Sequence, residues 1–492
     1  MESPNYYSIL GIPRDASQED IRKAFFDAAR RLHPDTNIAP GDTEFFIGAN
    51  EAYEVLSDVK KRAIYDAGLA PDRPVHLPVA QRIIFSRNNL VNMQDPQLVY
   101  ALLEFSPSLE NLNNLPSPPL NICLLIDRST SMKGANLDIV KATAKQILRR
   151  LRPQDIFSLV TFSDRAETII PSTQNGDLFK LEARIQMLQT SGGTEIFNGL
   201  IAAFTEVKRS FKSTIVNHII LLTDGRTYGD ENQCLELADQ AIKEGIGISG
   251  LGIGSDWNDS FLDELARRTG GSSFYVSHPH DIQQLLMEKF DHLGQIYAED
   301  ITIEFQKIKN IELNYAFRLQ PELGSLSLES PLHLGPILRN GCLTLLLEFL
   351  VSSTSSVNVI KLFDGQVKLR ISSQSNPVSS FAMQLTRPVS MTTNKPEPPP
   401  NEIIQALSQL SFYKMQEQAQ LEVAAGNYDQ ASNRLQRLAT NLLEQGNREL
   451  ARTVLLEAEH IKEKQTYSLE GHKRIKYGTR ALLLPGNGGK LP

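Results

Sequence analysis

The hydrophobic positions in the first part of the chain, residues 5–69, follow a helical period. They recur three or four residues apart in two stretches, as in amphipathic helices that bury one face. Ser17 and Asp20 form a capping-box-like start, and Pro34 disfavours helical geometry at His33, so that the first helix ends there. The pattern predicts an antiparallel helix pair with an exposed turn. Its apolar stripes are Ile21, Ala24, Phe25, Ala28 and Leu32, then Phe46, Ala49, Tyr53 and Leu56.

The central part of the chain alternates apolar runs with helical patterns. The run at residues 122–126 contains no polar position, which is typical of a central parallel strand covered on both faces. The order predicts a doubly wound open α/β sheet, in which ligand sites lie beyond the carboxyl ends of the strands. Further strands are expected at residues 155–162, 219–222 and 247–253, and helices at residues 136–151, 177–188, 198–210, 231–244, 259–269 and 281–294.

Strand-like patterns flank this α/β part on both sides. Neither flank has enough alternating strands to bury a two-sheet core, so we expect one β-sandwich built from both flanks, with the α/β part inserted between them. The strands are expected at residues 75–78, 82–85 and 97–105 before the α/β part, and at residues 301–303, 311–317, 343–351 and 367–371 after it.

The last part of the chain is predicted to be helical. A proline-rich linker precedes three helices broken at Gly426 and Gly446, which resemble tetratricopeptide-like hairpins without enough sequence for an array. The basic stretch at residues 473–477 is interpreted as a solvated end, with a docking peptide as the alternative.

The predicted boundaries are 1–70 for the N-terminal helices, 75–118 and 299–390 for the sandwich, 119–296 for the α/β domain, 391–400 for the linker, 401–465 for the helical bundle and 466–492 for the tail.

Composition narrows the class of protein. The 492 residues carry a formal net charge of −7, and 41% of them are hydrophobic, which is enough for several cores and argues against a nucleic-acid binder. Cys123, Cys234 and Cys342 lie far apart in apolar contexts, which indicates buried thiols rather than a disulfide framework. With no signal-like start and no apolar run long enough for a membrane span, the cytoplasm is the expected location.

Side chains with hard oxygen atoms follow the central apolar run. The spacing Asp-x-Ser-x-Ser places Asp127, Ser129 and Ser131 on a single turn. Thr194 lies in a Gly-Gly-Thr loop before a predicted helix, and Asp224 follows the next buried strand. Carboxylate and hydroxyl oxygens suit a small divalent cation far better than a soft one. The five residues together are predicted to form an octahedral oxygen cage for Mg²⁺ or Mn²⁺.

This set of five resembles the metal-ion-dependent adhesion site of von Willebrand factor type A domains, whose motif all five positions match. The resemblance implies that Asp127 and Asp224 act chiefly through bound waters, and that a partner protein supplies an Asp or Glu as the final ligand. Catalysis would need a second metal or a positioned base, which these strand ends do not offer. No catalytic residue is assigned, and an enzyme is not expected. Trp257, on the same rim, is interpreted as a packing residue.

Three short motifs occur in the N-terminal segment: Tyr6-Tyr7-x-Ile9-Leu10-Gly11, His33-Pro34-Asp35, and Asn50-Glu51-Ala52-Tyr53-Glu54-Val55-Leu56-Ser57-Asp58. With these motifs the segment resembles the J domain of DnaJ-family cochaperones. The resemblance implies that the tripeptide His33-Pro34-Asp35 stimulates the ATPase of a DnaK-class heat-shock chaperone.

A basic face accompanies the tripeptide. Arg22, Lys23 and Arg30 lie away from the apolar stripe, where they would steer an acidic partner; a merely solvated face is the alternative. Phe26 and Asp27 stand where the DnaJ family continues the basic face, which puts the strength of chaperone binding in doubt.

The combination predicts a cytoplasmic adaptor cochaperone: the type A domain grips a client protein while the J domain brings the ATP-driven chaperone to it. The alternative is an assembly scaffold in which the type A domain partners an AAA-type ATPase, with chaperone recruitment secondary. A metal-dependent hydrolase is a third reading, disfavoured because the oxygen cage lacks a base.

Overall fold

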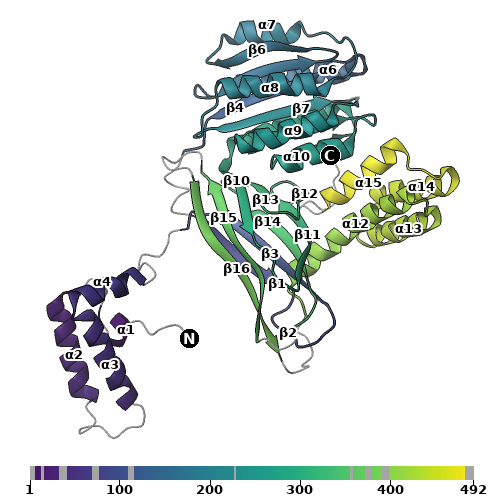
Figure 1. Ribbon diagram of the computed structural model, residues 1–492. Coiled ribbons are helices and arrows are strands. Elements are labelled where there is room, and N and C mark those ends of the chain that lie inside the picture. Colours follow the sequence, from purple (N-terminus) through teal and green to yellow (C-terminus); the bar gives the residue numbers. More distant parts are fainter. Residues whose placement is uncertain are drawn as a thin grey trace. The chain divides into compact units, whose positions relative to one another are not determined.

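The computed structural model describes residues 6–10, 12, 16–32, 42–68, 77–108, 116–226, 229–354, 358–371, 378–390 and 398–482 (Figure 1). The chain divides into two compact units, Met1–Leu77 and Pro78–Pro492, and each is described by itself. Within those ranges no helix combines the length and the apolar character that a membrane crossing requires.

The first unit is helical, as its hydrophobic period predicts. Ser17 and Asp20 form the capping box: the Ser17 amide donates to Asp20 Oδ2 at 3.0 Å, and the Asp20 amide donates to Ser17 Oγ at 3.2 Å. A short first helix and a fourth helix were not predicted; Arg62 of the fourth donates from Nε to the Tyr7 hydroxyl at 2.9 Å and so joins the two. The helices are α1 Tyr6–Leu10, α2 Gln18–Leu32, α3 Asp42–Leu56 and α4 Val59–Gly68.

The α/β domain contains a six-stranded sheet in the order β6-β5-β4-β7-β8-β9. Its strands run parallel except for β6, which pairs antiparallel with β5 at the edge. Both edge strands, β6 and β9, were missed by the sequence pattern, and β6 is polar over much of its length. The strands are β4 Leu120–Asp127, β5 Ile156–Phe162, β6 Ala166–Gln174, β7 Val216–Thr223, β8 Gly247–Ile253 and β9 Ser273–Val276.

Helices cover both faces of this sheet, which explains why β4 lacks polar alternation. Ile122, Leu124 and Ile126 pack into a core with α6 and α11, whereas Cys123 and Leu125 face the opposite core with α8, α9 and α10. Figure 1 shows these last three helices along one side of the sheet. The helices are α6 Ala135–Arg150, α7 Leu178–Gln186, α8 Ile196–Arg209, α9 Glu231–Lys243, α10 Asp259–Arg268 and α11 Pro279–Gly294.

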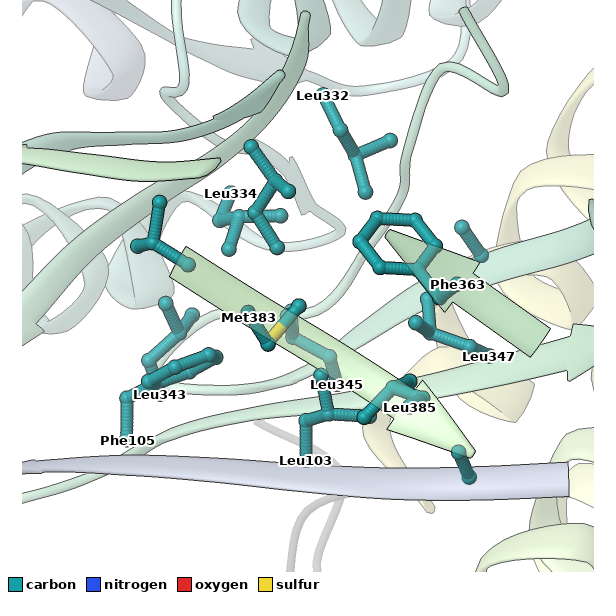
Figure 2. Close-up of a cluster of buried hydrophobic side chains, with 14 of the residues drawn as sticks. Leu103, Phe105, Leu332, Leu334, Leu343, Leu345, Leu347, Phe363, Met383 and Leu385 are labelled. Atoms are coloured by element: carbon teal, nitrogen blue, oxygen red, sulfur yellow. The ribbon is translucent and has the colours of Figure 1, made fainter. Parts of the chain in front are cut away.

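Segments before and after the α/β domain form two five-stranded sheets with a shared core. β3 pairs antiparallel with β14, with Leu103 opposite Leu345, so strands from both flanks share one sheet. Figure 2 shows Leu103, Leu345 and Met383 among the side chains that fill the space between the sheets. The strands are β1 Val79–Phe85, β2 Leu90–Val91, β3 Gln97–Pro107, β10 Ile296–Phe305, β11 Ile311–Gln320, β12 Gly324–Ser325, β13 Leu332–Leu338, β14 Leu343–Val351, β15 Val359–Arg370 and β16 Val378–Ser390.

The predicted fold class is thereby confirmed: a helical N-terminal domain, a doubly wound α/β domain inserted in a β-sandwich, and C-terminal helices. Of the strand predicted at residues 75–78, only residues 77 and 78 are described, and they precede β1, which begins at Val79. All three cysteines are free; Cys123 and Cys234 are buried, as expected, but Cys342 is only half-buried.

The C-terminal helices correct one expectation. The three predicted helices are present, and Gly426 and Gly446 separate them with positive φ angles of 80° and 84°, a conformation that glycine adopts without strain. Residues 466–492, however, are not simply a tail, because a fourth helix packs Lys473 and Lys476 into buried positions against the α/β domain. The helices are α12 Asn401–Ala424, α13 Tyr428–Glu444, α14 Arg448–Lys464 and α15 Leu469–Ala481.

Candidate metal centre

The five predicted metal-binding residues come from three segments at the carboxyl edge of the α/β sheet. Asp127 is the last residue of β4, and Ser129 and Ser131 follow it at the short 3-10 helix η1, Thr130–Met132. Asp224 comes directly after β7, the parallel neighbour of β4. Because neighbouring parallel strands end at the same edge, the two carboxylates are placed next to each other by the topology.

Hydrogen bonds draw these side chains into one cluster. Ser131 Oγ donates to Asp224 Oδ1 at 2.7 Å, and the Ser129 and Ser131 hydroxyl oxygens are 2.9 Å apart. The Ser129 hydroxyl lies 3.4 Å from the same carboxylate oxygen of Asp224. The prediction that these residues gather at one point therefore agrees with the geometry.

Asp127 is held by the backbone and by its neighbouring strand. Its Oδ1 accepts a hydrogen bond from the Ser129 amide at 2.8 Å, and its Oδ2 accepts one from the Thr223 hydroxyl at 2.7 Å. The side chain is fully buried. Both carboxylate oxygens of Asp127 are therefore held in fixed directions. Hydrogen bonds of this kind orient the ligands and waters around metal ions in proteins.

Thr194 reaches the cluster from the loop before α8. A β-carbon on Gly225 would lie 2.7 Å from the Thr194 hydroxyl oxygen, so the threonine side chain packs directly against the backbone that follows Asp224. This close approach requires glycine at position 225. Thr194 is thus next to the residue that follows Asp224, although it lies about thirty residues away from it in sequence.

Both carboxylates of the cluster are harder to ionise than usual. The pKa of Asp224 is raised to about 6: burial is the main cause, the hydrogen bond from Ser131 acts against it, and the nearby Asp127 carboxylate adds to the rise. Burial also raises the pKa of Asp127, against the hydrogen bonds from Ser129 and Thr223. A cation between the two carboxylates would remove this penalty.

The chemistry of the donors fits a hard divalent cation. All five side chains offer oxygen, which Mg²⁺ and Mn²⁺ prefer. In the described ranges, no three His, Cys, Asp or Glu side chains gather in a way that could hold a metal ion. Three of the five predicted ligands are hydroxyl groups, so a cation held by this set would be short of negative charge.

A second loop on this side of the domain was missed by sequence reasoning. Three consecutive carbonyl groups after β8 accept hydrogen bonds from two cations: Lys473 Nζ of α15 donates to the oxygens of Ser255 and Trp257, both at 2.5 Å, and Arg226 Nε donates to the oxygen of Asp256 at 3.0 Å. Arg226 is two residues from Asp224, so α15 is linked through this segment to the loop predicted to bind a metal.

Trp257 anchors the same loop from inside. Its side chain is fully buried, and its indole Nε1 donates to the Gly254 oxygen at 2.8 Å. The interpretation of Trp257 as a packing residue therefore agrees with the structure. It also packs close against Gly252, where a β-carbon would lie 2.0 Å from the indole ring.

Ion pairs hold α15 in place beside this loop. Arg480 donates to Asp263 of α10, and Lys476 Nζ lies 2.8 Å from Asp263 Oδ2. Burial alone would raise the pKa of Asp263, but the charges of Arg480 and Lys476 outweigh it and hold the pKa well below its usual range. The basic stretch at residues 473–477, expected to be a solvated end, is therefore part of a helix that buries Lys473 and Lys476 and leaves Arg474 exposed.

The predicted chaperone-binding residues are described only in part. Arg22 and Lys23 are exposed on α2, as a docking face requires, and the Arg22 guanidinium lies 5.9 Å from the centre of the Phe26 ring. Arg30 is within α2, but its side chain is outside the described part of the structure, and so are His33, Pro34 and Asp35.

Three known domain families match separate parts of the chain. The DnaJ domain matches residues 5–66, the von Willebrand factor type A domain matches residues 121–288, and the Sll0103-like C-terminal alpha-helical domain matches residues 401–485.

Curated relatives match the same parts. An uncharacterized Synechocystis protein, sll0103, is 27% identical over 335 residues, which are 65% of this chain and 78% of that protein. Chaperone protein DnaJ 2 of Streptomyces avermitilis is 54% identical over 67 residues. Those residues are 14% of this chain and only 18% of the chaperone, so the likeness covers the J domain alone.

Two solved structures share the fold. A von Willebrand factor type A protein from Catenulispora acidiphila superimposes with a TM-score of 0.63 at 15% identity, covering 83% of this chain and 98% of that one. The ArnB paralog VWA2 from Sulfolobus acidocaldarius gives a TM-score of 0.50 at 16% identity, covering 83% and 100%. The chain therefore combines an N-terminal DnaJ domain, a von Willebrand factor type A domain with its flanking β-sandwich, and a C-terminal helical domain of the Sll0103-like kind.

Proposed function

We propose that this protein is an adaptor cochaperone whose metal centre binds a client or partner protein while its J domain recruits a DnaK-class chaperone. The observation that carries the proposal is the gathering of Asp127, Ser129, Ser131, Thr194 and Asp224 at one sheet edge, in a chain that begins with a DnaJ domain. The proposal places the protein in the cytoplasm.

The metal centre acts in binding rather than in reaction. A bound Mg²⁺ or Mn²⁺ supplies an electrophilic position that accepts an Asp or Glu from the partner. The protein's own residues fix the direction of the oxygens: Ser131 holds Asp224, and Thr223 holds Asp127. None of the five residues is a His or Lys that could act as a base on a metal-bound water, so we assign no catalytic residue.

The J domain contributes by stimulating ATP hydrolysis in another protein, the DnaK-class chaperone. The tripeptide at residues 33–35 stimulates the chaperone's ATPase, and the exposed Arg22 and Lys23 steer the encounter with an acidic partner surface. Phe26 is 53% exposed on the same helix. This apolar group restricts which chaperone binds, because it replaces charge on the docking face.

A pull-down with the full chain tests both halves together. In Mg²⁺ the protein is expected to capture a DnaK-class chaperone and a second protein, and in EDTA only the chaperone. Asp127→Ala should lose the second protein alone. His33→Gln should lose stimulation of the chaperone's ATPase while metal-dependent capture persists.

Two outcomes would contradict the adaptor function. Recovery of an AAA-type ATPase in Mg²⁺, with no stimulation of any DnaK-class chaperone, would favour the assembly scaffold. Capture of the second protein that is equal in Mg²⁺, in EDTA and with Asp127→Ala would show that the cluster is not the binding site.

A further inference from the structure

The loop that carries Thr194 is wrapped around an acidic side chain that belongs to none of the five metal-binding positions. Asp164 lies in the turn between β5 and β6, and its Oδ1 accepts a hydrogen bond from the Gly193 amide at 2.7 Å. The neighbouring Gly192 packs still closer, since a β-carbon there would lie 2.4 Å from Asp164 Oδ2. Gly192 also has a φ of +75°, so this residue must be glycine for two reasons.

The backbone on the other side of Thr194 is fixed by the same turn. The Glu195 amide donates to the carbonyl oxygen of Ser163 at 2.9 Å. Thr194 therefore lies between two residues whose amides are both bound by the turn at 163–164. Beyond them, α8 packs against β5 at Gly199, where a β-carbon would lie 2.8 Å from the Phe162 side chain.

The start of the Thr194 loop is tied to the first metal-binding loop. The Ser191 amide donates to the Arg128 oxygen at 2.8 Å, and the Thr130 amide donates to the Gly192 oxygen at 3.2 Å. These bonds join the loop to the Asp-x-Ser-x-Ser turn at one end, while Asp164 holds it at the other. The position of the Thr194 hydroxyl is the result of both.

We propose that Asp164 is a positioning residue of the metal centre: its carboxylate fixes the Gly192-Gly193 turn and thereby sets the reach of the Thr194 hydroxyl toward the cation. This inference rests on the proposed metal-binding function and deepens it. It assigns a role to Asp164 that is distinct from metal ligation, because the contact on which it depends is a hydrogen bond to the backbone.

The test compares Mn²⁺ affinity of full-length variants by isothermal titration calorimetry, with the metal alone as the probe. Outer groups that orient metal ligands typically change affinity by about 10- to 100-fold when removed. We expect Asp164→Ala to weaken Mn²⁺ binding about tenfold. Asp164→Asn keeps an oxygen that accepts the Gly193 hydrogen bond, and it should restore affinity to within about threefold of the wild type.

A double variant shows whether Asp164 acts through Thr194. If it does, Asp164→Ala combined with Thr194→Ala should bind Mn²⁺ as Thr194→Ala does, within about twofold, because the second change removes nothing more. Additive losses, or an Asp164→Asn affinity as low as that of Asp164→Ala, would overturn the positioning role and indicate a direct charge effect.

The chain offers a matched control for a general loss of stability. Asp177 is another exposed aspartate whose carboxylate accepts a backbone hydrogen bond, from the Lys180 amide at 3.2 Å. Asp177 follows β6, which runs antiparallel to β5 and ends next to the start of β5. Asp177 therefore lies beyond the amino ends of the parallel strands, away from the predicted metal-binding residues at their carboxyl ends. Asp177→Ala should leave Mn²⁺ affinity unchanged.

The same experiment separates this inference from the proposed function. Asp127→Ala is expected to abolish Mn²⁺ binding. If it does so while Asp164→Ala binds like the wild type, the metal centre stands and the role of Asp164 is wrong. A wild-type chain that binds no Mn²⁺ would contradict the proposed function, and the role of Asp164 with it.

Discussion

The ammonium nitrogen of Lys473 lies 4.5 Å from the centre of the Trp257 ring, and it donates hydrogen bonds to the carbonyl oxygens on either side of Asp256. Burial lowers the pKa of Lys473 to about 8. Helix α15 thus inserts a cation into the loop that also accepts a hydrogen bond from Arg226, two residues after Asp224.

Replacing Lys473 should disturb this loop more than the surface around it. Lys473→Met keeps much of the side-chain volume but leaves two carbonyl oxygens without their donor, which costs about 1–3 kcal/mol for each buried group left unpaired. We expect the free energy of unfolding, measured by urea titration, to fall by an amount in that range. The fluorescence of Trp257 should also change. Arg474→Met is the control, because Arg474 forms an exposed pair with Glu470 that is worth about 0–1 kcal/mol. Equal effects of the two changes would contradict the insertion of Lys473.

The ion pairs of Asp263 predict a loss of stability in acid. The pKa of Asp263 is depressed in the folded protein, chiefly by Arg480 and Lys476 acting against burial. Its contribution to stability is therefore complete above the unfolded pKa of about 4 and is lost as the pH falls through the lower folded value. Urea unfolding of the wild type between pH 5 and pH 2.5 should show this loss.

The matching variant is Asp263→Asn. Leaving Arg480 and Lys476 without their partner should cost about 3–5 kcal/mol at neutral pH, and the difference between variant and wild type should shrink as the pH falls below 4. A difference that stays constant over the whole pH range would show that Asp263 is not the titrating group.

Removal of a metal-binding carboxylate should affect stability in opposite ways with and without the metal. In EDTA, Asp224→Asn removes one of two buried charges that repel each other, so we expect it to be at least as stable as the wild type. In Mg²⁺ at 100 times the dissociation constant, only the wild type gains the expected stabilisation of about 2.7 kcal/mol. Thermal unfolding in both conditions measures the difference, and an equal gain in both proteins would contradict the assignment of Asp224.

The pairing of β3 with β14 predicts that the two flanks unfold together. Leu103 is fully buried between the sheets, opposite Leu345, so Leu103→Ala should cost about 2–5 kcal/mol. Hydrogen exchange should then accelerate in β14 as well as in β3. Leu98 of the same strand is 40% exposed, and Leu98→Ala should have a small effect. Faster exchange confined to β3 would show that the flanks are not one cooperative unit.

The parts of the fold that the sequence predicted are those with a strong local signal. The uninterrupted apolar run of β4 marks a strand buried on both faces, and the oxygen-bearing residues after it mark the edge where ligands bind. Asp127 and Asp224 are brought together by the parallel pairing of β4 and β7 alone. Such a placement follows from topology and does not depend on side-chain detail.

The parts that sequence did not predict depend on partners far away in the chain. Lys473, Lys476 and Arg480 are typical of a solvated helix face, and they are buried only because Asp259, Asp263 and a carbonyl-lined loop of the α/β domain receive them. The sequence around Asp164 likewise does not indicate its role. That role depends on Gly192 and Gly193, which pack around its side chain in the folded protein. β6 was missed because an edge strand carries polar residues that hide its period.

The insertion of the α/β domain also sets the order in which the parts of the chain can fold during synthesis. β3 emerges from the ribosome roughly 240 residues before its partner β14, so at a synthesis rate of about 5–20 residues per second it waits about 12–50 s. During that interval β3 can pair only with β1, and its apolar face, with Leu103 and Phe105, has no second sheet to pack against. The α/β domain that follows, in contrast, contains all the strands of its own sheet. The nascent chain therefore carries an uncovered apolar strand pair until β14 is made, and the sandwich closes after the α/β sheet.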